Sequence, residues 1–477
     1  MWTTEQLKEL ADHNPHKLLA LVIDLQERIQ ALQARLAKDS SNSSKPPSSD
    51  GLKKPLRTQS LREKSERRPG GQIGHLGSTL QQVNDPDRVI VHAVSQCYRC
   101  GESLDGRPVD SLERRQIFEL PPLKVEVTEH QGQIKISSRC GTKNHAVFPK
   151  EVRYPVAYGN RSKAVAVYMT TQQLIPFQRA ENMLRDMFSM TISASTIFQI
   201  HKKCYENLES VSQKIKDRII HSEIAHFDES RINCQKKLSW LHVASTQTET
   251  FYQLHPKRGR EAMYDIGILT QFQGKAVHDH WQSYFDYDHC DHVLCNAHHL
   301  RELKFISEQE KEDWADQMRT CLLEIYQEVK RSKAMGENGL LPQQISTFQN
   351  RYNKILRQGL EYHQRLKPLC PAQTQNSKRG RKKQRPGKNM LDRLQKHRGE
   401  TLGFMVDFSL PFTNNLGERD LRMNKLKQKI SGCFRSWEGA KYFCRIRGFI
   451  STTRKQGGNI LQALELASQG QCSDSFG

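Results

Sequence analysis

The chain has 477 residues, enough for two to four domains, and its 73 Lys and Arg residues outnumber its 52 Asp and Glu residues to give a net charge of +21. The sequence contains no long uncharged apolar run, which excludes a transmembrane helix, and it begins without a secretory pattern. We therefore expect a cytoplasmic protein, associated with the nucleoid of a bacterium, with its twelve cysteines reduced. A positive charge of this size favours a polyphosphate partner such as DNA or RNA, although an anionic membrane would attract it too.

Residues 1–38 are predicted to form a coiled-coil helix, with Asn14 as its N-cap and Pro15 in its first turn. Apolar residues then recur in alternating steps of four and three, which is the spacing of a coiled-coil seam. The seam residues are Leu18, Val22, Leu25, Ile29, Leu32 and Leu36. The pattern predicts self-association, and the alternative is an amphipathic helix packed on its own chain.

Residues 39–80 are predicted to be a basic disordered linker. The segment SSNSSKPPSSDG is rich in Ser and Pro, and the segment that follows is basic and rich in Gly. Such a composition buries too little apolar surface to become ordered. Its basic residues from Lys53 to Arg68 could lie along a DNA backbone, or the segment could be a solvated linker.

Residues 81–155 are predicted to form a small zinc-finger-like β domain. RVIVHAV and KVEVTEHQGQIKIS alternate with the period of a strand and bracket Cys97 and Cys100, which have the spacing of a zinc knuckle. Cys140 would be a third ligand, but Ser137 stands where its partner cysteine is expected. A histidine would then complete the zinc site. The alternative is a knuckle of the same fold that binds no metal.

Residues 161–215 are predicted to be helical, with two helices joined by a short turn as in a helix-turn-helix, and with Ser193 as N-cap of the second helix. In a protein that reads DNA, four residues of that helix would face the groove: Ser195, Thr196, Gln199 and Lys202. The alternative is a helical bundle that supports the next domain and does not read DNA bases. We favour this alternative.

Residues 221–455 are predicted to form an α+β domain, followed by a tail at 456–477. A strand should end at Asp228, a hairpin should follow, residues 261–272 should be a helix, and another strand should end at Asp279. A further strand then runs into a helix. This order of elements is that of a ribonuclease-H-like domain, and the mostly helical, polar residues 301–405 suit an insertion in it.

In the segment 414–455 one acid, Glu418, precedes a basic run. Residues 419–455 contain eleven basic residues and only two acidic ones. An acid repels the phosphates that such a run attracts, unless a divalent metal lets carboxylate and phosphate share a site. With Asp228 and Asp279, Glu418 could hold two Mg²⁺ or Mn²⁺ ions about 4 Å apart for phosphodiester chemistry. The alternative is a basic helical surface with one stray Glu.

The basic residues predicted to contact DNA lie in this run and in the acid-free loop 377–388, and Arg419 and Arg422 are spaced to clamp one phosphate. The alternative for those two arginines is a solvated helix face. The full predicted set is Arg419, Arg422, Lys425, Lys427, Lys429, Arg435, Lys378, Arg379 and Arg381.

Cys295 and His298 have the spacing of half a zinc site, with His299, Cys290 and His289 nearby. We interpret them instead as packing and hydrogen-bonding residues where a strand meets a helix.

Along nearly its full length the chain resembles transposases of the insertion sequence 66 family. The resemblance rests on SSNSSKPPSSDG, RPGGQIGHLGSTL, LIPFQRAENML, ISASTI, HFDES, VHDHWQSY, CNAHHLRELK and, most specifically, FTNNLGERDLRMNKLKQKISGCFRS. It implies a ribonuclease-H-like core whose Asp-Asp-Glu set is Asp228, Asp279 and Glu418. The family's zinc region usually has two cysteine pairs, and Ser137 departs from that pattern.

The resemblance further implies an enzyme that binds the inverted ends of its element, cleaves at their 3′ ends and joins them to target DNA. The expected partners are double-stranded DNA, further copies of the chain in a synaptic complex, and accessory transposition proteins. Two other functions stay open: a DNA-binding remnant of a transposase without catalysis, and a metal-dependent nuclease that does not join.

Overall fold

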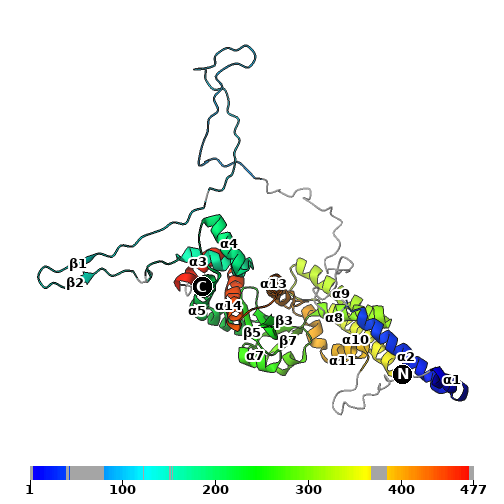
Figure 1. Ribbon diagram of the computed structural model, residues 1–477. Helices are drawn as coiled ribbons and strands as arrows, with labels where there is room; N and C mark the ends of the chain where they lie inside the picture. The colour runs from blue at the N-terminus through cyan, green and yellow to red at the C-terminus, as the bar shows by residue number, and fades with distance from the viewer. Residues whose placement is uncertain are drawn as a thin grey trace.

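The computed structural model of the protein describes residues 4–38, 42, 80–121, 123–149, 152, 154–366 and 384–471. Its body is a mixed sheet with helices packed around it, so the predicted α+β class is confirmed (Figure 1). Among the described residues, no helix is both long and apolar enough to cross a bilayer.

The central sheet has the strand order β5-β4-β3-β6-β7. Its strands are β3 (Ile224–Cys234), β4 (Lys237–Ser245), β5 (Thr250–His255), β6 (Lys275–His278) and β7 (Asp291–Leu294). β4 is antiparallel to both of its neighbours, which confirms the predicted hairpin, whereas β6 and β7 run parallel to β3. The carboxyl ends of β3, β6 and β7 therefore point to one edge of the sheet.

Two predicted boundaries in this domain are wrong. β3 continues past Asp228 to Cys234, because its pairing with β4 persists through Cys234 and Lys237. What ends just before Asp228 is the ladder to β6, whose last pair joins His226 to Val277. The helix predicted over 261–272 is shorter, since α7 (Arg260–Ile266) ends at a glycine with φ of 67°.

One group of helices shares a hydrophobic core with the sheet through Phe227 and Ala244. The helices are α3 (Asn160–Val167), η2 (Tyr168–Gln172), α4 (Phe177–Phe188), α5 (Ala194–Asn207), α6 (Glu209–Ile220), α14 (Trp437–Lys455) and α15 (Ile460–Gln469). The Ser193 hydroxyl accepts a hydrogen bond from the Thr196 amide, so Ser193 caps α5 as predicted. Packing of α5 against α14 supports the bundle alternative for these helices.

The second group of helices contains the residues of the predicted insertion and packs on the sheet through Val277 and Val293. Its elements are α8 (Asn296–Phe305), η4 (Ile306–Glu310), α9 (Asp313–Ala334), α10 (Pro342–Arg365), α11 (Pro386–Lys396), α12 (Arg398–Leu402) and η5 (Gly403–Met405). After the insertion, α13 (Asn415–Ser431) returns to the sheet and buries Leu421 against Ile232 and Leu241. A short 3₁₀ turn, η3 (Gln282–Asp286), follows β6.

The segment before this body holds little regular structure. β1 (Ile134–Ile136) and β2 (Lys143–His145) form a small hairpin that lies away from the sheet (Figure 1). The predicted strand RVIVHAV does not form: Val89, Ile90 and Val91 are exposed and belong to no sheet of the described residues. Alternation alone cannot make a strand when no neighbouring strand accepts its hydrogen bonds.

The N-terminal segment forms α1 (Thr4–His13) and α2 (Pro15–Leu36), with Pro15 in the first turn of α2 as predicted. Leu25, Ile29 and Leu32 of the predicted seam are exposed to solvent in the single chain. Pairing of this seam with another helix stays a prediction.

Gly274 should be a strong determinant of stability, because it precedes β6 in a crowded turn. A Cβ atom there would lie 2.5 Å from the carbonyl oxygens of both Glu223 and Ser222. Gly274→Ala is expected to destabilise the fold by about 1–3 kcal/mol and lower its Tm in a thermal scan. Gly399→Ala is the matched control, since a Cβ atom there meets nothing within 4 Å. Equal Tm values for the two variants would contradict this account of the turn.

Candidate active site

Asp228 and Asp279 are brought level by the parallel pairing of β3 with β6. The register joins Ile224 to Lys275 and His226 to Val277. Continuing it by two residues sets Asp228 beside Asp279, which directly follows β6. Neighbouring strands lie about 4.8 Å apart and residues two apart share a face, so a continued register would place the two aspartates on one face at the same edge.

Glu418 reaches this edge through the first turn of α13, which Asn414 fixes in place. The Asn414 side chain donates to the Phe227 carbonyl at 2.8 Å and pairs with His226 Nδ1 at 2.8 Å. A Cβ atom on Gly417 would lie 3.4 Å from that of Asp228, so the turn is in contact with β3. Glu418 is the next residue along the helix.

Asp228 lies in a strongly acidic environment. Burial raises the pKa of Asp228 well above its usual range, and the charges of Glu229, Asp279 and Glu418 raise it further. Burial also raises the pKa of Asp279, although the Trp281 amide donates a hydrogen bond to Asp279 Oδ1 at 2.8 Å. The neighbourhood is therefore rich in buried negative charge, which a divalent cation would neutralise. Among the described residues, Asp228, Asp279 and Glu418 do not form a group of ligand atoms within 4.8 Å of one another. Their role as metal ligands stays a prediction.

Glu229, the neighbour of Asp228 in HFDES, points to the other face of the sheet and is compensated there. Arg258 Nε donates to its Oε1 at 2.7 Å, and the Tyr284 hydroxyl donates to its Oε2 at 2.5 Å. Arg258 also stacks over the ring of Trp281 at 3.9 Å. Because side chains alternate along the strand, Glu229 and Asp228 point to opposite faces. Glu229 is paired with an arginine there, whereas Asp228 is paired with none among the described residues.

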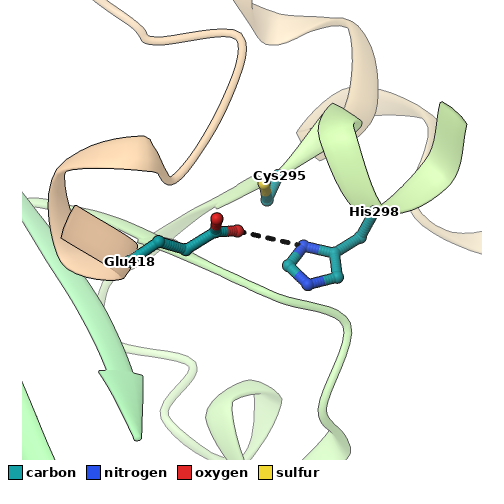
Figure 2. A group of neighbouring side chains, drawn as sticks. All are labelled: Cys295, His298 and Glu418. Carbon is teal, nitrogen blue, oxygen red and sulfur yellow. Dashed lines mark ion pairs between the residues drawn. The ribbon is translucent and has the colours of Figure 1, made fainter. Parts of the chain in front are cut away.

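A second group of ligand-type side chains lies beside Glu418. Cys295, at the end of β7, and His298, in the first turn of α8, approach Glu418 with ligand atoms within 4.8 Å of one another (Figure 2). His298 Nδ1 lies 3.9 Å from Glu418 Oε1, and Arg301 Nη2 lies 3.5 Å from the same oxygen. Burial raises the pKa of Cys295 to about 12 and lowers that of His298 to about 3.

Cys295 also has the hydrogen-bonding role that we expected at the junction of strand and helix. Its sulfur accepts a hydrogen bond from the Asn414 amide at 3.1 Å. The Asn296 amide donates to the Phe412 carbonyl at 3.0 Å beside it. Through these contacts the start of α8 and the segment before α13 are held together.

The predicted zinc knuckle and its partner turn have the same backbone geometry. Gly101 N donates to Cys97 O at 2.9 Å, and Gly141 N donates to Ser137 O at 2.9 Å. Both glycines have positive φ, of 76° and 68°. Ser137 therefore occupies the position in the second turn that Cys97 occupies in the first.

The three predicted zinc ligands do not form a common cluster in the structure. Within the described ranges, the only group of three or more ligand atoms close enough to share an ion is that of Cys295, His298 and Glu418. Hydrogen bonds with Ser137 and Thr142 lower the pKa of the Cys140 thiol to about 7. Zinc binding by Cys97, Cys100 and Cys140 stays a prediction.

The predicted DNA-binding residues differ in how accessible they are. Arg419, Arg422, Lys429 and Arg435 are exposed on or just after α13. Lys425 and Lys427 are half-buried, and burial lowers the pKa of Lys427. The remaining three, Lys378, Arg379 and Arg381, lie outside the described residues.

Several residues that shape the site were not predicted from the sequence. Asn414 gave a signal, because an Asn before an acidic first turn is typical of a helix N-terminus. Arg301, Arg258 and Tyr284 gave none, since their partners are distant in the chain.

Comparison with known proteins identifies the class of the chain. Residues 156–442, more than half of its length, match the family described as Transposase IS66 family. Residues 3–81 match a family of unknown function, DUF6444. No curated protein gives a significant match. The protein is thus a transposase, a class of nucleic-acid-processing enzymes that bind DNA. Within that class the chain belongs to the IS66 family.

Replacing Asp228 with Asn should stabilise the metal-free protein. The folded state raises the pKa of Asp228, so it binds this proton more tightly than the unfolded state does. The stability that this proton contributes is therefore lost as the pH rises from about 3.9, the ordinary pKa of an Asp, through the raised pKa of Asp228. With a chelator present, we expect Asp228→Asn to raise the Tm at pH 8 and the difference to shrink on acidification.

The control for this measurement is Asp186→Asn, an exposed acid on α4, which should leave the Tm unchanged across the same pH range. A Tm difference for Asp228→Asn that is independent of pH, or a destabilisation at pH 8, would contradict the buried-charge account.

Proposed function

We propose that this transposase binds the inverted-repeat ends of an insertion sequence, cleaves them at their 3′ ends and joins them to target DNA. The proposal is supported by the placement of the three predicted acids on elements that border the carboxyl ends of β3 and β6. Asp228 comes from β3, Asp279 follows β6 and Glu418 lies in α13. The chain would act on DNA in the bacterial cytoplasm.

Asp228, Asp279 and Glu418 would together hold Mg²⁺ or Mn²⁺. The donors fit such ions, since carboxylate oxygens are the ligands that Mg²⁺ prefers. Burial raises the pKa of both Asp228 and Asp279, and a bound cation would offset the cost of their buried charge. Bound ions would activate the attacking water or 3′-hydroxyl and stabilise the leaving oxygen.

The protein's own part in this chemistry is positioning. The Trp281 amide orients the Asp279 carboxylate through its hydrogen bond to Oδ1. Asn414 ties the first turn of α13 to β3, which keeps Glu418 close to Asp228. Misplacement by even about 1 Å can reduce a rate about 10²-fold, so these contacts matter for turnover.

A ribonuclease-H-like core is the fold that we infer for residues 221–455. The support is the order of elements along the chain: strand β3, hairpin β4–β5, helix α7, strands β6 and β7, and helix α8. The helices α9 to α12 interrupt it between α8 and α13, as an insertion ahead of the Glu would.

DNA backbone contacts would come from the exposed basic residues that follow Glu418. Arg419 and Arg422 are one helical turn apart on α13, where a bidentate contact to one phosphate is feasible. Lys425, Lys427, Lys429 and Arg435 would extend this track, and Lys378, Arg379 and Arg381 would add to it. Contacts of this kind position DNA, whereas the acids act in the chemistry.

Two further features would serve assembly. The exposed seam of α2 would pair with a second copy of the chain in the synaptic complex. Cys97, Cys100 and Cys140, with a histidine, would hold a structural zinc ion once the two knuckle turns meet. Accessory transposition proteins would complete the complex.

Asp228→Asn should abolish strand cleavage while leaving binding to the element's ends intact. The substitution removes a charge from the ion site but keeps the side chain's shape, and phosphate contacts come from other residues. End binding is measured by gel shift, and cleavage and joining are measured with end-containing DNA and Mg²⁺.

The matched control is Asp291→Asn, an exposed acid at the opposite end of the neighbouring parallel strand β7, which should retain cleavage. A variant Asp228→Asn that cleaves at the wild-type rate would remove Asp228 from the active site. Wild-type protein that binds ends but never cuts, with accessory proteins present, would support the binding-only function. Cutting without joining would support the nuclease.

Replacing Leu25 and Leu32 with Glu should reduce self-association, because charges would then line the α2 seam. We expect a lower oligomeric state by light scattering and weaker binding to paired ends. Gln26 and Gln33 are exposed polar positions next to the seam residues, so Gln26→Glu with Gln33→Glu is the control for added charge. An unchanged oligomeric state in the Leu variant would rule out the seam as an interface.

A further inference from the structure

The junction between β7 and α8 holds buried polar atoms, and only Glu418 among their residues belongs to the proposed catalytic set. His298 Nδ1 and Glu418 Oε1 are both buried, and neither has a hydrogen-bond partner among the described residues. The Cys295 sulfur completes a group whose ligand atoms lie within 4.8 Å of one another. Figure 2 shows His298 and Glu418 pointing toward each other from α8 and α13, with Cys295 beside the gap between them. Unpaired buried polar atoms are costly, and a bound ion would satisfy them.

We propose that Cys295, His298 and Glu418 form a binding site for one divalent transition-metal ion of the Zn²⁺ class. This site is separate from the Asp228 and Asp279 pair and shares only Glu418 with it. It stands whether or not those two aspartates hold Mg²⁺.

The donor atoms select the metal. A thiolate and an imidazole favour Zn²⁺ or Co²⁺, whereas Mg²⁺ prefers oxygen ligands alone. Two ligand atoms of a tetrahedral zinc ion lie about 3.4 Å apart, given metal–ligand distances of about 2.0–2.1 Å for nitrogen and oxygen. The 3.9 Å between His298 Nδ1 and Glu418 Oε1 needs only a small side-chain rotation to reach that separation. Three protein ligands leave a fourth position open to water or to a phosphate oxygen.

The charges of the site balance with the ion bound. Binding would deprotonate the Cys295 thiol, so the sulfur forms a bond to the metal and one proton leaves to solvent. A thiolate and a carboxylate then carry two negative charges against the two positive charges of the ion. Arg301 is the neighbouring cation that opposes binding, because its Nη2 lies 3.5 Å from Glu418 Oε1. Its Nε donates to the Ala297 carbonyl at 3.1 Å, an anchor on α8 that does not involve Glu418.

An ion in this site would fix Glu418 Oε1 toward α8, where it already lies beside His298 and Arg301. The orientation of the proposed catalytic Glu would then depend on occupancy of the Cys295–His298 site. The segment around Asn414 would be tightened as well, since its amide already donates to the Cys295 sulfur.

The test uses Co²⁺ as a spectroscopic substitute for Zn²⁺ in the full chain. Cys97, Cys100 and Cys140 are first replaced by Ser, because these accessible thiols would bind cobalt on their own. In this parent protein we expect one Co²⁺ per chain, with a near-ultraviolet thiolate-to-cobalt band and intense visible bands of tetrahedral cobalt. Adding Cys295→Ser should remove the thiolate band and weaken Co²⁺ binding at least about 100-fold. Loss of a residue that merely supports a ligand already weakens metal affinity by up to about 100-fold, and Cys295 would be a ligand itself.

Cys290→Ser is the matched control, because Cys290 is a nearby buried thiol whose contact is with the Tyr287 carbonyl. It should keep the band, whereas Glu418→Gln should keep the band but weaken binding. Cys295→Ser preserves a hydrogen-bond acceptor for the Asn414 amide. If the Cys295→Ser protein nevertheless does not fold, Glu418→Gln serves as the second test of a ligand. A thiolate band that survives Cys295→Ser, an affinity unaffected by Glu418→Gln, or no thiolate band in the parent would overturn the site.

Asp228→Asn separates this inference from the proposed function. We expect it to keep the cobalt band even though cleavage is lost. Loss of cleavage with no cobalt band in the parent would leave the proposed function standing and reject the transition-metal site. A normal cobalt band together with unimpaired cleavage by Asp228→Asn would support the transition-metal site and reject the proposed role of Asp228 in cleavage.

Discussion

The parallel pairing of β3 with β6 is the constraint on which the arrangement of the site depends. Continued by two residues, it would set Asp228 level with Asp279, and α13 packs against β3 beside Asp228. A shift of one residue in this register would move one aspartate to the opposite face, where Arg258 already compensates Glu229. The crowded turn at Gly274 and the burial of Val277 in the core of the insertion hold that register.

No cation of the described part of the chain is among the main charges that act on Asp228, whereas the buried acid Asp420 is paired with a lysine. Asp420 lies only two residues after Glu418 and is also buried, but Lys455 Nζ is 2.8 Å from its Oδ2 and Thr250 donates to it as well. The charges that act most strongly on Asp228 are instead those of other acids. Burying like charges together costs stability. A fold that keeps them there, while it pairs their neighbours, is well explained by a cation that the acids share.

Much of the domain could be predicted from the sequence, because its signals are local. The hairpin, the strand before Asp279 and the helix bearing Glu418 each follow from a pattern within a dozen residues. The end of β3 could not be predicted, because it depends on pairing with β4. The strand expected at 88–94 fails for a related reason: its alternation is local, but strand formation needs a partner. The group of Cys295, His298 and Glu418 brings together two motifs from distant parts of the chain, so its geometry emerges only in the fold.

The central claim is that Asp228, Asp279 and Glu418 hold a divalent cation in common. Anomalous diffraction from crystals of the protein grown with Mn²⁺ would test it most directly. The account predicts an anomalous peak at this edge of the sheet, about 2.1 Å from oxygens of at least two of the three carboxylates. Crystals in which Mn²⁺ binds elsewhere, while these carboxylates remain without an ion, would contradict it.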